Sequence, residues 1–352
     1  MEQLAVSPLG KILNTPTFGL CVQAVAELDK PVDIPSAKKS IFEILVSQNP
    51  RFSSILIMKE NGVVQWEKTE VNMDDHVFVP DFPPHLISYD KYVDEYVTDM
   101  HSRKLSPSRP LWEFHFLNYK TTNGEATMIM NVHHTLGDGA SFVALASACS
   151  AIPSHNPTLP QTLIPPSTSQ VHKRTLDTTW FGFDGIYRLV NDVVMGVVFY
   201  GFRQYCQMEL SDPKHIENLR VTAMTLINTR TRRSTKNVKV KPKSKTGVPQ
   251  GNSFGFLQLK VPMKKLENPL EYVQRAKHMT DKKKISLATL LISKVLTYIT
   301  LFKGPEASAR VMYNTLANTT LSVTNVNGPM EQLIFEGHKV KNCFFSVSGF
   351  PQ

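Results

Sequence analysis

A proline-rich segment near the middle of the 352-residue chain separates two regions that each carry strand-like and helix-like patterns. Residues 152–170 read IPSHNPTLPQTLIPPSTSQ, in which proline, serine and threonine predominate. Proline lacks a backbone N–H and fixes φ, so this segment suits neither a helix interior nor a central strand. Because domains commonly contain about 100–200 residues, we expect two subdomains, over residues 1–151 and 191–352, joined by a linker over residues 152–190.

Hydrophobic periodicity predicts a mixed α/β fold for the first region. Apolar residues recur at helical spacing between Tyr89 and Arg103, whereas residues 111–117 alternate as a strand does. An Asn123-Gly124 turn then leads into a second strand-like run. The expected strands lie at 54–58, 62–66, 111–117 and 126–132, and the expected helices at 89–103 and 140–151.

The second region shows the same mixture. The expected helices lie at 191–205, 269–283 and 285–302, and the expected strands at 221–228, 253–261, 320–326 and 341–347. The apolar helix at 285–302 approaches the length of a membrane span, but Lys294 lies at its centre. It is better explained as a buried or surface-docked helix, so we expect any membrane association to be peripheral.

The net charge of +9 is concentrated in one segment. Residues 229–247 contain eight cations and no acid, namely Arg230, Arg232, Arg233, Lys236, Lys239, Lys241, Lys243 and Lys245. Such a run is typical of a solvated basic loop, or of a contact for the phosphates of a ligand or a membrane surface. No aromatic residues lie among these cations to stack on bases, which argues against a nucleic-acid partner.

The cysteines and the N-terminus exclude several other classes. Cys21, Cys149, Cys206 and Cys343 form no Cys-x-x-Cys pair, which argues against a zinc ribbon, a thioredoxin-type site and a disulfide scaffold. The first residues lack the basic start and apolar run of a secretory signal, which predicts a cytosol-facing protein.

The segment with the strongest chemical implication is Asn131-Val-His133-His134-Thr-Leu-Gly137-Asp138-Gly139, between an expected strand and an expected helix. Successive strand side chains point to opposite faces, so His133 and His134 cannot both face one site. One should serve the chemistry while the other packs or hydrogen-bonds. Asp138 could hold an imidazole, cap the following helix or pair with a distant arginine, and Gly139 leaves room for a substrate.

Other interpretations compete with a catalytic histidine. Two histidines and an aspartate could bind a metal, but adjacent histidines on a strand point apart and no further ligand cluster is visible. The motif could also hold only two hydrogen-bonded histidines and a helix cap. Gly251-Asn-Ser253-Phe-Gly255 matches the nucleophile elbow of serine hydrolases. That elbow needs a helix after the serine, and a strand-like run follows here, so we interpret this match as chance.

The segment HHTLGDGAS resembles the HHxxxDG signature of the acyl-CoA-dependent acyltransferases related to chloramphenicol acetyltransferase. Six further segments narrow the resemblance to the plant wax ester synthase/diacylglycerol acyltransferase family. They are Pro50-Arg-Phe-Ser53, Asp75-His-Val-Phe-Val-Pro80, Ser108-Arg-Pro-Leu-Trp-Glu113, Asn191-Asp192, Leu226-Ile-Asn-Thr-Arg230 and Val323-Thr-Asn-Val-Asn-Gly-Pro329. They occur in the family's order and cover most of the chain.

This resemblance implies an α/β fold of two chloramphenicol acetyltransferase-like subdomains with mixed sheets, the second incomplete, and a tunnel between them. It implies that His134 is the catalytic base and that Asp138 is its mainly structural partner. Other positions match supporting motifs of the family, namely His133, Gly139, Asn191, Asp192, Asn325, Gly328 and Pro329.

The resemblance also implies transfer of a fatty acyl group from acyl-CoA to a long-chain fatty alcohol, which gives a wax ester, or to diacylglycerol, which gives triacylglycerol. A neutral imidazole with a pKa of about 6.5 can take the proton of the attacking hydroxyl. The thioester is already activated, so we expect no covalent acyl-enzyme and no bound cofactor, with acyl-CoA as co-substrate. The implied location is the cytosolic face of the endoplasmic reticulum membrane, or the plasma membrane.

Two departures from the family pattern fall on the second subdomain. Residues 185–190 lead almost directly into Asn191-Asp192, where relatives have a longer connection, and relatives continue beyond Gln352 through a strand and a helix. An alternative is therefore a catalytically impaired paralogue or isoform that binds lipid or membrane without turnover. A third interpretation keeps the fold and the chemistry with a soluble acceptor, such as a small phenolic alcohol.

Overall fold

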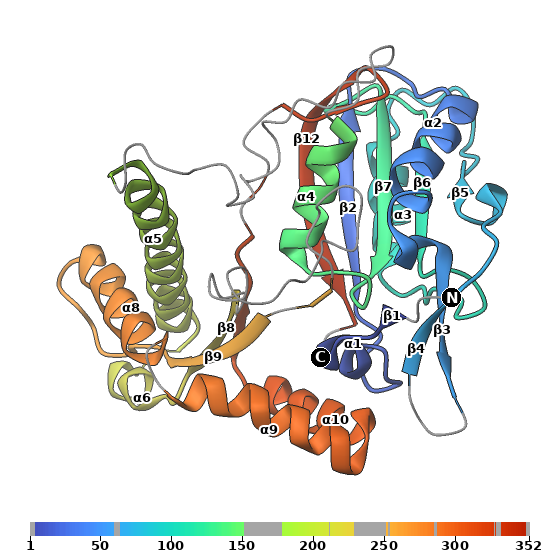
Figure 1. Ribbon diagram of the computed structural model, residues 1–352. Helices are drawn as coiled ribbons and strands as arrows, with labels where there is room; N and C mark the ends of the chain where they lie inside the picture. The colour runs from blue at the N-terminus through green and yellow to red at the C-terminus, as the bar shows by residue number, and fades with distance from the viewer. Residues whose placement is uncertain are drawn as a thin grey trace. The chain divides into compact units, whose positions relative to one another are not determined.

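The structure is a computed structural model with mixed α/β architecture, as the sequence predicts (Figure 1). It describes residues 4–59, 64–150, 178–210, 212–228, 251–252, 254–284, 287–326, 328 and 332–349. The chain forms two compact units. The first contains Met1–Pro165, Thr231–Asn252 and Asn327–Phe350, and the second contains Pro166–Arg230, Ser253–Val326 and Pro351–Gln352.

The first unit is built on a six-stranded sheet with the order β11-β12-β2-β7-β6-β5. Its strands are β2 (Cys21–Leu28), β5 (Val77–Phe78), β6 (Trp112–Leu117), β7 (Ala126–His133), β11 (Ile334–Phe335) and β12 (His338–Ser348). Strands β5 and β6 pair in parallel and the other neighbours pair antiparallel. A smaller sheet has the order β1-β4-β3, with β1 (Leu4–Ala5), β4 (Val64–Lys68) and β3 (Ser54–Met58).

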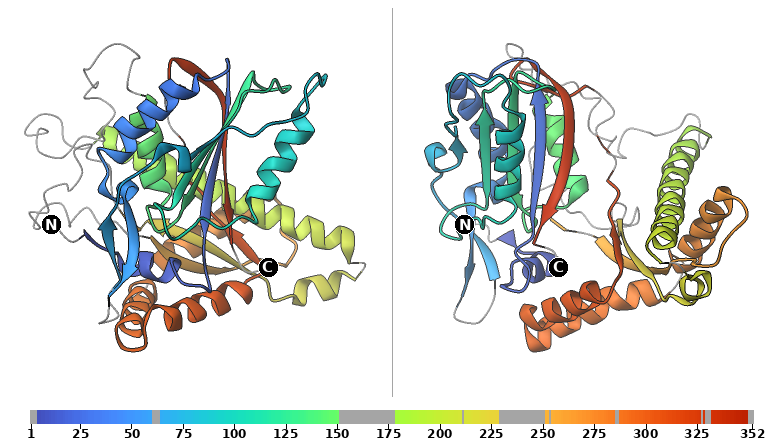
Figure 2. Two further views of the ribbon diagram at one scale, coloured as in Figure 1. Left: turned by 90° about the vertical axis from the view of Figure 1, so that its right-hand side faces the viewer. Right: turned by 180° about the vertical axis from the view of Figure 1, so that it is seen from behind.

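Helices cover both faces of the six-stranded sheet, and Figure 2 shows α3 and α4 on opposite sides of it. The helices of this unit are α1 (Pro8–Leu13), α2 (Ile34–Ile41), the π-helical turn η1 (Phe42–Val46), the short turns η2 (Pro50–Ser53) and η3 (Met73–Asp75), α3 (Asp90–Met100) and α4 (Gly139–Ser150). Met130 and Val132 of β7 pack with α4, whereas Ile129 packs with α3 on the other face. This alternation follows from the two-residue period of a strand.

The second unit contains a three-stranded sheet with the order β10-β8-β9. Its elements are α5 (Thr178–Glu209), α6 (Pro213–Asn218), β8 (Thr222–Asn228), β9 (Phe254–Lys260), α8 (Pro269–Lys284), α9 (Leu287–Lys303), α10 (Pro305–Ala317) and β10 (Leu321–Val323). Strand β8 pairs antiparallel with β9 and parallel with β10. Phe199 of α5, Tyr272 of α8 and Leu259 of β9 are buried together in its core. None of the helices within the described residues is long and apolar enough to cross a membrane.

The division of the chain differs from the predicted domains in two respects. The last strand, β12, pairs with β2 along its length, so residues 327–350 belong to the first unit rather than to the predicted subdomain 191–352. The pairing satisfies the backbone groups along an edge of β2 that would otherwise be open. Helix α5 begins at Thr178, so residues 178–190 are helical rather than part of the linker. Residues 152–177, the basic segment 229–247 and the expected turn at 60–62 lie outside the described residues.

Candidate active site

The central motif forms a tight turn at the end of β7. The N–H of His134 donates to the carbonyl of Leu20 at 2.8 Å, and the N–H of Leu136 donates to that of His133 at 3.0 Å. A Cβ atom at Gly137 would lie 2.8 Å from the Cβ of Ser141, so this turn needs glycine there. The backbone therefore leaves the strand at His134 and returns directly into α4.

The two adjacent histidines have different surroundings, as the strand periodicity predicts. His133 is only 7% exposed, and its Nδ1 accepts a hydrogen bond of 3.2 Å from the N–H of Thr135. Burial lowers the pKa of His133 to about 4, with a smaller contribution from His134. His133 is therefore neutral near pH 7, packs in the interior and accepts a hydrogen bond that holds this turn.

His134 is half-buried and contacts Asn252, which lies 118 residues away in the sequence. The amide Nδ2 of Asn252 donates to the carbonyl of His134 at 2.8 Å and to that of Thr135 at 3.4 Å. Its Oδ1 is therefore the acceptor that lies 2.9 Å from His134 Nδ1, so Nδ1 carries the proton. This hydrogen bond leaves the lone pair of the neutral ring on Nε2.

Opposing effects act on the pKa of His134. Burial lowers it, whereas hydrogen bonds to the backbone of His134 and to Asn252, together with the charge of Asp138, raise it. The net pKa lies below the ordinary value, so the imidazole is neutral at physiological pH. A neutral imidazole with a fixed Nδ1–H and an Nε2 lone pair is the form that a general base needs.

Asp138 caps helix α4, one of the roles considered from the sequence. Its Oδ1 accepts hydrogen bonds from the backbone N–H of Ser141 at 3.1 Å and from the Ser141 hydroxyl at 3.0 Å. Aspartate is among the preferred residues for this position because its carboxylate satisfies N–H groups that have no partner within the helix. Gly139 is the first residue of α4.

Arg51 supports the other side of the turn. It is buried, and its Nη1 donates to the carbonyl of Leu136 at 3.3 Å. Gly251 has a φ of +82°, and a Cβ there would lie 3.1 Å from Nη1 of Arg51. Glycine therefore lets the chain pass close to the Arg51 guanidinium just before Asn252. Arg51 comes from the Pro50-Arg-Phe-Ser53 segment, which thereby gains a role in holding the histidine turn.

Asn252 is the functional residue that the sequence interpretation missed. It lies inside the match to the serine-hydrolase elbow, and β9 follows directly at Phe254, so the helix that an elbow requires is absent at that position, as expected. Ser253 itself lies outside the described residues. No local pattern identifies Asn252, because its partners come from a turn more than a hundred residues away.

The remaining motif residues lie apart from this turn in the sequence and take other partners. In the second unit, the amide of Asn325 donates to Asn191 Oδ1, and buried Asp192 lies 3.9 Å from the ammonium group of Lys277. These contacts tie α5 to α8 and to the segment after β10. Gly328 belongs to the first unit, and Pro329 lies outside the described residues.

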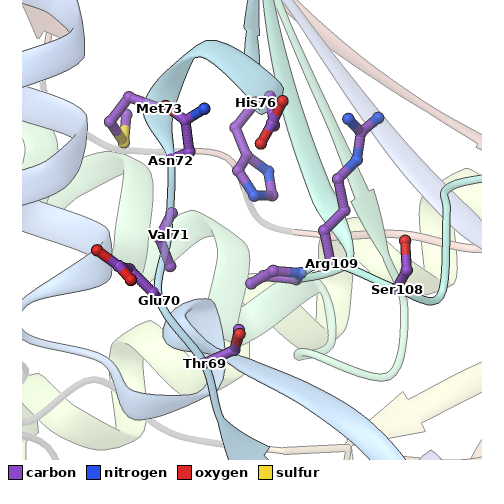
Figure 3. A pocket seen from close by; sticks show the side chains of 10 residues that line it. Thr69, Glu70, Val71, Asn72, Met73, His76, Ser108 and Arg109 are labelled. Atoms are coloured by element: carbon purple, nitrogen blue, oxygen red, sulfur yellow. The ribbon is translucent and has the colours of Figure 1, made fainter.

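A polar pocket of about 650 Å³ lies where two of the family-like segments, 75–80 and 108–113, meet. His76 is buried, its Nδ1–H donates to the carbonyl of Trp112 at 2.7 Å, and its ring stacks on the indole with centroids 4.1 Å apart. Figure 3 shows His76 between Asn72 and Arg109. Arg109 is paired with Glu113 at 2.5 Å, so both segments are engaged in packing the start of β6.

Known proteins share both sequence domains of the chain. Residues 22–242 match the wax ester synthase/diacylglycerol acyltransferase catalytic domain, and residues 250–352 match the WS/DGAT C-terminal domain. The chain belongs to the wax ester synthase/diacylglycerol acyltransferase family. The family resemblance expected from the sequence is thereby confirmed.

Individual relatives of this family cover the whole chain. Wax ester synthase/diacylglycerol acyltransferase 11 of Arabidopsis thaliana is 27% identical over 427 positions, which cover 100% of this chain and 86% of the relative. Wax ester synthase/diacylglycerol acyltransferase 2 of the same organism is also 27% identical, and the alignment covers 99% of this chain and 86% of that relative. The alignment with the first of these relatives has 427 positions, which is more than the 352 residues of this chain. The first relative therefore has internal residues that this chain lacks. This agrees with the expected internal shortening.

Solved structures confirm the fold. The wax ester synthase/diacylglycerol acyltransferase from Marinobacter aquaeolei VT8 superposes with a TM-score of 0.56 at 14% identity, covering 98% of this chain and 87% of that one. The first condensation domain of the CDA synthetase gives a TM-score of 0.58 at 12% identity, and the superposition covers 98% of this chain and 84% of that domain's chain. The chain therefore has the predicted chloramphenicol acetyltransferase-like class of fold.

Proposed function

We infer that this chain is an O-acyltransferase that moves a fatty acyl group from acyl-CoA to a long-chain alcohol or to diacylglycerol. The observation that carries this inference is the hydrogen bond between His134 and Asn252, which places the proton of a neutral imidazole on Nδ1 and leaves Nε2 unprotonated. The family matches support the same reaction class, and they give no support to the non-catalytic alternative.

The proposed reaction follows from this geometry. As the acceptor hydroxyl oxygen attacks the thioester carbonyl, its proton passes to His134 Nε2 and a C–O bond forms. Collapse of the tetrahedral intermediate breaks the C–S bond, and the leaving thiolate of CoA takes the proton back from the imidazolium. The hydrogen bond to Asn252 and the negative charge of Asp138 both favour the imidazolium, so they stabilise the intermediate in which it forms.

The proposed reaction needs no bound cofactor, because the thioester supplies the activated acyl group. Acyl-CoA is then a co-substrate rather than a resident group. We assign His134 as the base, with Asn252, Asp138 and Arg51 as positioning residues that hold the turn. The roles of His133, Asn191, Asp192 and Asn325 are structural in this proposal.

We also propose that the enzyme works at a membrane surface, on the cytosolic face of the endoplasmic reticulum. Helix α9 leaves large apolar side chains in solvent, including Tyr298 at 59%, Leu301 at 71% and Phe302 at 84% exposure. Exposed Lys294 and Lys303 lie on the same helix and would complement anionic lipid headgroups. Flotation with anionic and neutral vesicles tests this: Leu301→Asp/Phe302→Asp should weaken recovery with anionic vesicles, and unchanged recovery would contradict it.

The reaction itself is tested by supplying the chain with palmitoyl-CoA and either hexadecanol, diacylglycerol or a small phenolic alcohol. Ester product and released CoA are measured together, and a reaction without acceptor corrects for hydrolysis. We expect ester with hexadecanol or diacylglycerol. Ester only with the phenolic alcohol would replace the acceptor class, and no ester from a folded chain would contradict the proposed function.

A further inference from the structure

An apolar cavity of about 70 Å³ lies inside the first unit, between the six-stranded sheet and the helices on the α4 face. Its lining comes from strands β2, β6, β7, β11 and β12 and from α2, η1 and α4, and every lining side chain is apolar apart from the Cys343 thiol. Protein interiors rarely leave such space empty, and cavities without polar groups exclude water while accepting apolar molecules.

Two alanines on β2 account for the space. Ala24 lies between Met130 of β7 and Phe345 of β12, and Ala26 lies in the equivalent position beside Met128 and Cys343. A methyl group between larger neighbours leaves a hollow in the middle of the sheet face. The deep part of this hollow is closed by buried side chains, whereas Phe345 at its edge is 40% exposed.

The cavity lies on one face of β7, and the catalytic His134 continues the same face at the end of this strand. Met128, Met130 and Val132 alternate on this face, and His134 comes next with the same two-residue period. The ring of Phe142 on α4 lies 6.3 Å from the His134 imidazole, and Leu145, one helical turn further along, lines the cavity. Four strand residues span about 13 Å from Met130 to His134, which is shorter than an extended long-chain acyl group.

We propose that this cavity receives the distal end of the hydrocarbon chain of the acyl donor, and that Ala24 and Ala26 set the preferred acyl length. This assignment rests on the proposed acyltransferase function. With its thioester carbonyl next to the acceptor hydroxyl that faces His134 Nε2, the donor would lay its chain along Phe142 and Leu145, where methylene groups leave water for an apolar surface. The same pocket could take the alcohol chain instead, and the test separates these two sources.

The kinetic test fills the cavity with Ala24→Leu. We expect the ratio of kcat/KM for palmitoyl-CoA over octanoyl-CoA, with hexadecanol as acceptor, to fall at least 10-fold. Val25→Leu adds volume on the opposite face of the same strand and should move this ratio less than 2-fold. An unchanged ratio in Ala24→Leu, or a shift in alcohol preference at fixed palmitoyl-CoA instead, would overturn the proposal.

A binding test keeps the proposal separable from the reaction. Isothermal titration uses S-hexadecyl-CoA and S-octyl-CoA, thioethers that cannot be cleaved. We expect the wild-type chain to bind the longer ligand at least 10-fold more tightly, and Ala24→Leu to reduce this difference below 3-fold. Met128→Ala, which enlarges the cavity, should preserve or increase it. Wild-type discrimination without ester formation would defeat the proposed function alone, whereas ester formation without any effect of Ala24→Leu would defeat the cavity assignment alone.

Discussion

The two units differ in what their polar motif residues do. In the first, Arg51, His134 and Asn252 come from three distant segments and meet around one turn, where their hydrogen bonds fix the proton on one imidazole nitrogen. In the second, Asn191 and Asp192 face Asn325 and Lys277, contacts that join helices and a loop. Under the proposed function, the proton transfer takes place in the first unit, and the motif residues of the second unit hold its helices and loop together.

The sheets of the two units also differ. The first unit packs helices on both faces of a six-stranded sheet. The second has three described strands, and its helix α5 leaves apolar side chains exposed at helical spacing. Val193, Val197 and Met208 belong to this exposed face. The shortening expected before Asn191 falls in this second unit. We therefore expect changes in the first unit to affect catalysis and core stability more than matched changes on the exposed face of α5.

The largest effect is expected from His134→Ala. Removing the base should lower kcat by about 10²–10⁴-fold while the circular dichroism spectrum stays native. Asn191→Ala, the matched change in a motif of the second unit, should lower kcat less than 10-fold. Normal turnover by His134→Ala would show that the base is a different residue, and equal losses in both variants would break the contrast between the units.

The pH dependence of stability should reveal His133. Its pKa is about 4 in the folded chain and about 6.5 when unfolded, so between these values only the unfolded chain binds the proton. The free energy of unfolding should therefore fall by about 3 kcal/mol from this residue as the pH drops from 7 to 4. Urea unfolding across this range should give a flatter dependence for His133→Asn, and an unchanged slope would refute the assignment.

Replacing Asn252 should change both the rate and its pH dependence. A hydrogen bond to a charged group contributes about 1.5–3 kcal/mol, so Asn252→Ala should lower kcat by about 10–100-fold. Asn252 raises the pKa of His134, so its loss should move the acidic limb of the kcat/KM profile to lower pH, and Asn252→Asp should move it to higher pH. If the acidic limbs of the three kcat/KM profiles were identical, Asn252 would have no influence on the pKa of His134.

Asp138→Ala should act mainly on stability. Loss of this helix cap costs about 0.5–2 kcal/mol and should lower Tm by a few degrees, with a moderate loss of activity because the histidine turn loosens. Differential scanning calorimetry and the ester assay are run on the same sample. An unchanged Tm with catalysis abolished would contradict the structural role and make Asp138 part of the chemistry.

The smallest effect is expected on the exposed face of α5. Val197→Lys should change the free energy of unfolding by less than about 0.5 kcal/mol, because Val197 is 60% exposed. Phe199→Ala, two residues away in the buried core, should cost about 3–5 kcal/mol. Comparable urea midpoints for the two variants would mean that the face of α5 is covered in solution.

The local elements of the fold and the histidine motif could be predicted from the sequence because they depend on nearby residues. The alternation that marks β7, the helical spacing of α3 and the cap at Asp138 are of this kind. Strand β12 could not be placed, because its pairing with β2 joins the two ends of the chain. Asn252 could not be found for the same reason: its contact with His134 spans 118 residues, and its own segment resembles an unrelated motif.

The proposed function requires His134 to be a neutral base whose Nδ1 carries the proton and whose Nε2 is unprotonated. Imidazole ¹⁵N chemical shifts of ¹⁵N-histidine-labelled protein at pH 7.5 measure this directly, with His134→Ala providing the assignment. We expect a protonated Nδ1 and an unprotonated Nε2 for His134, with loss of this pattern in Asn252→Ala. A protonated Nε2 with a bare Nδ1 in the wild-type chain would contradict it.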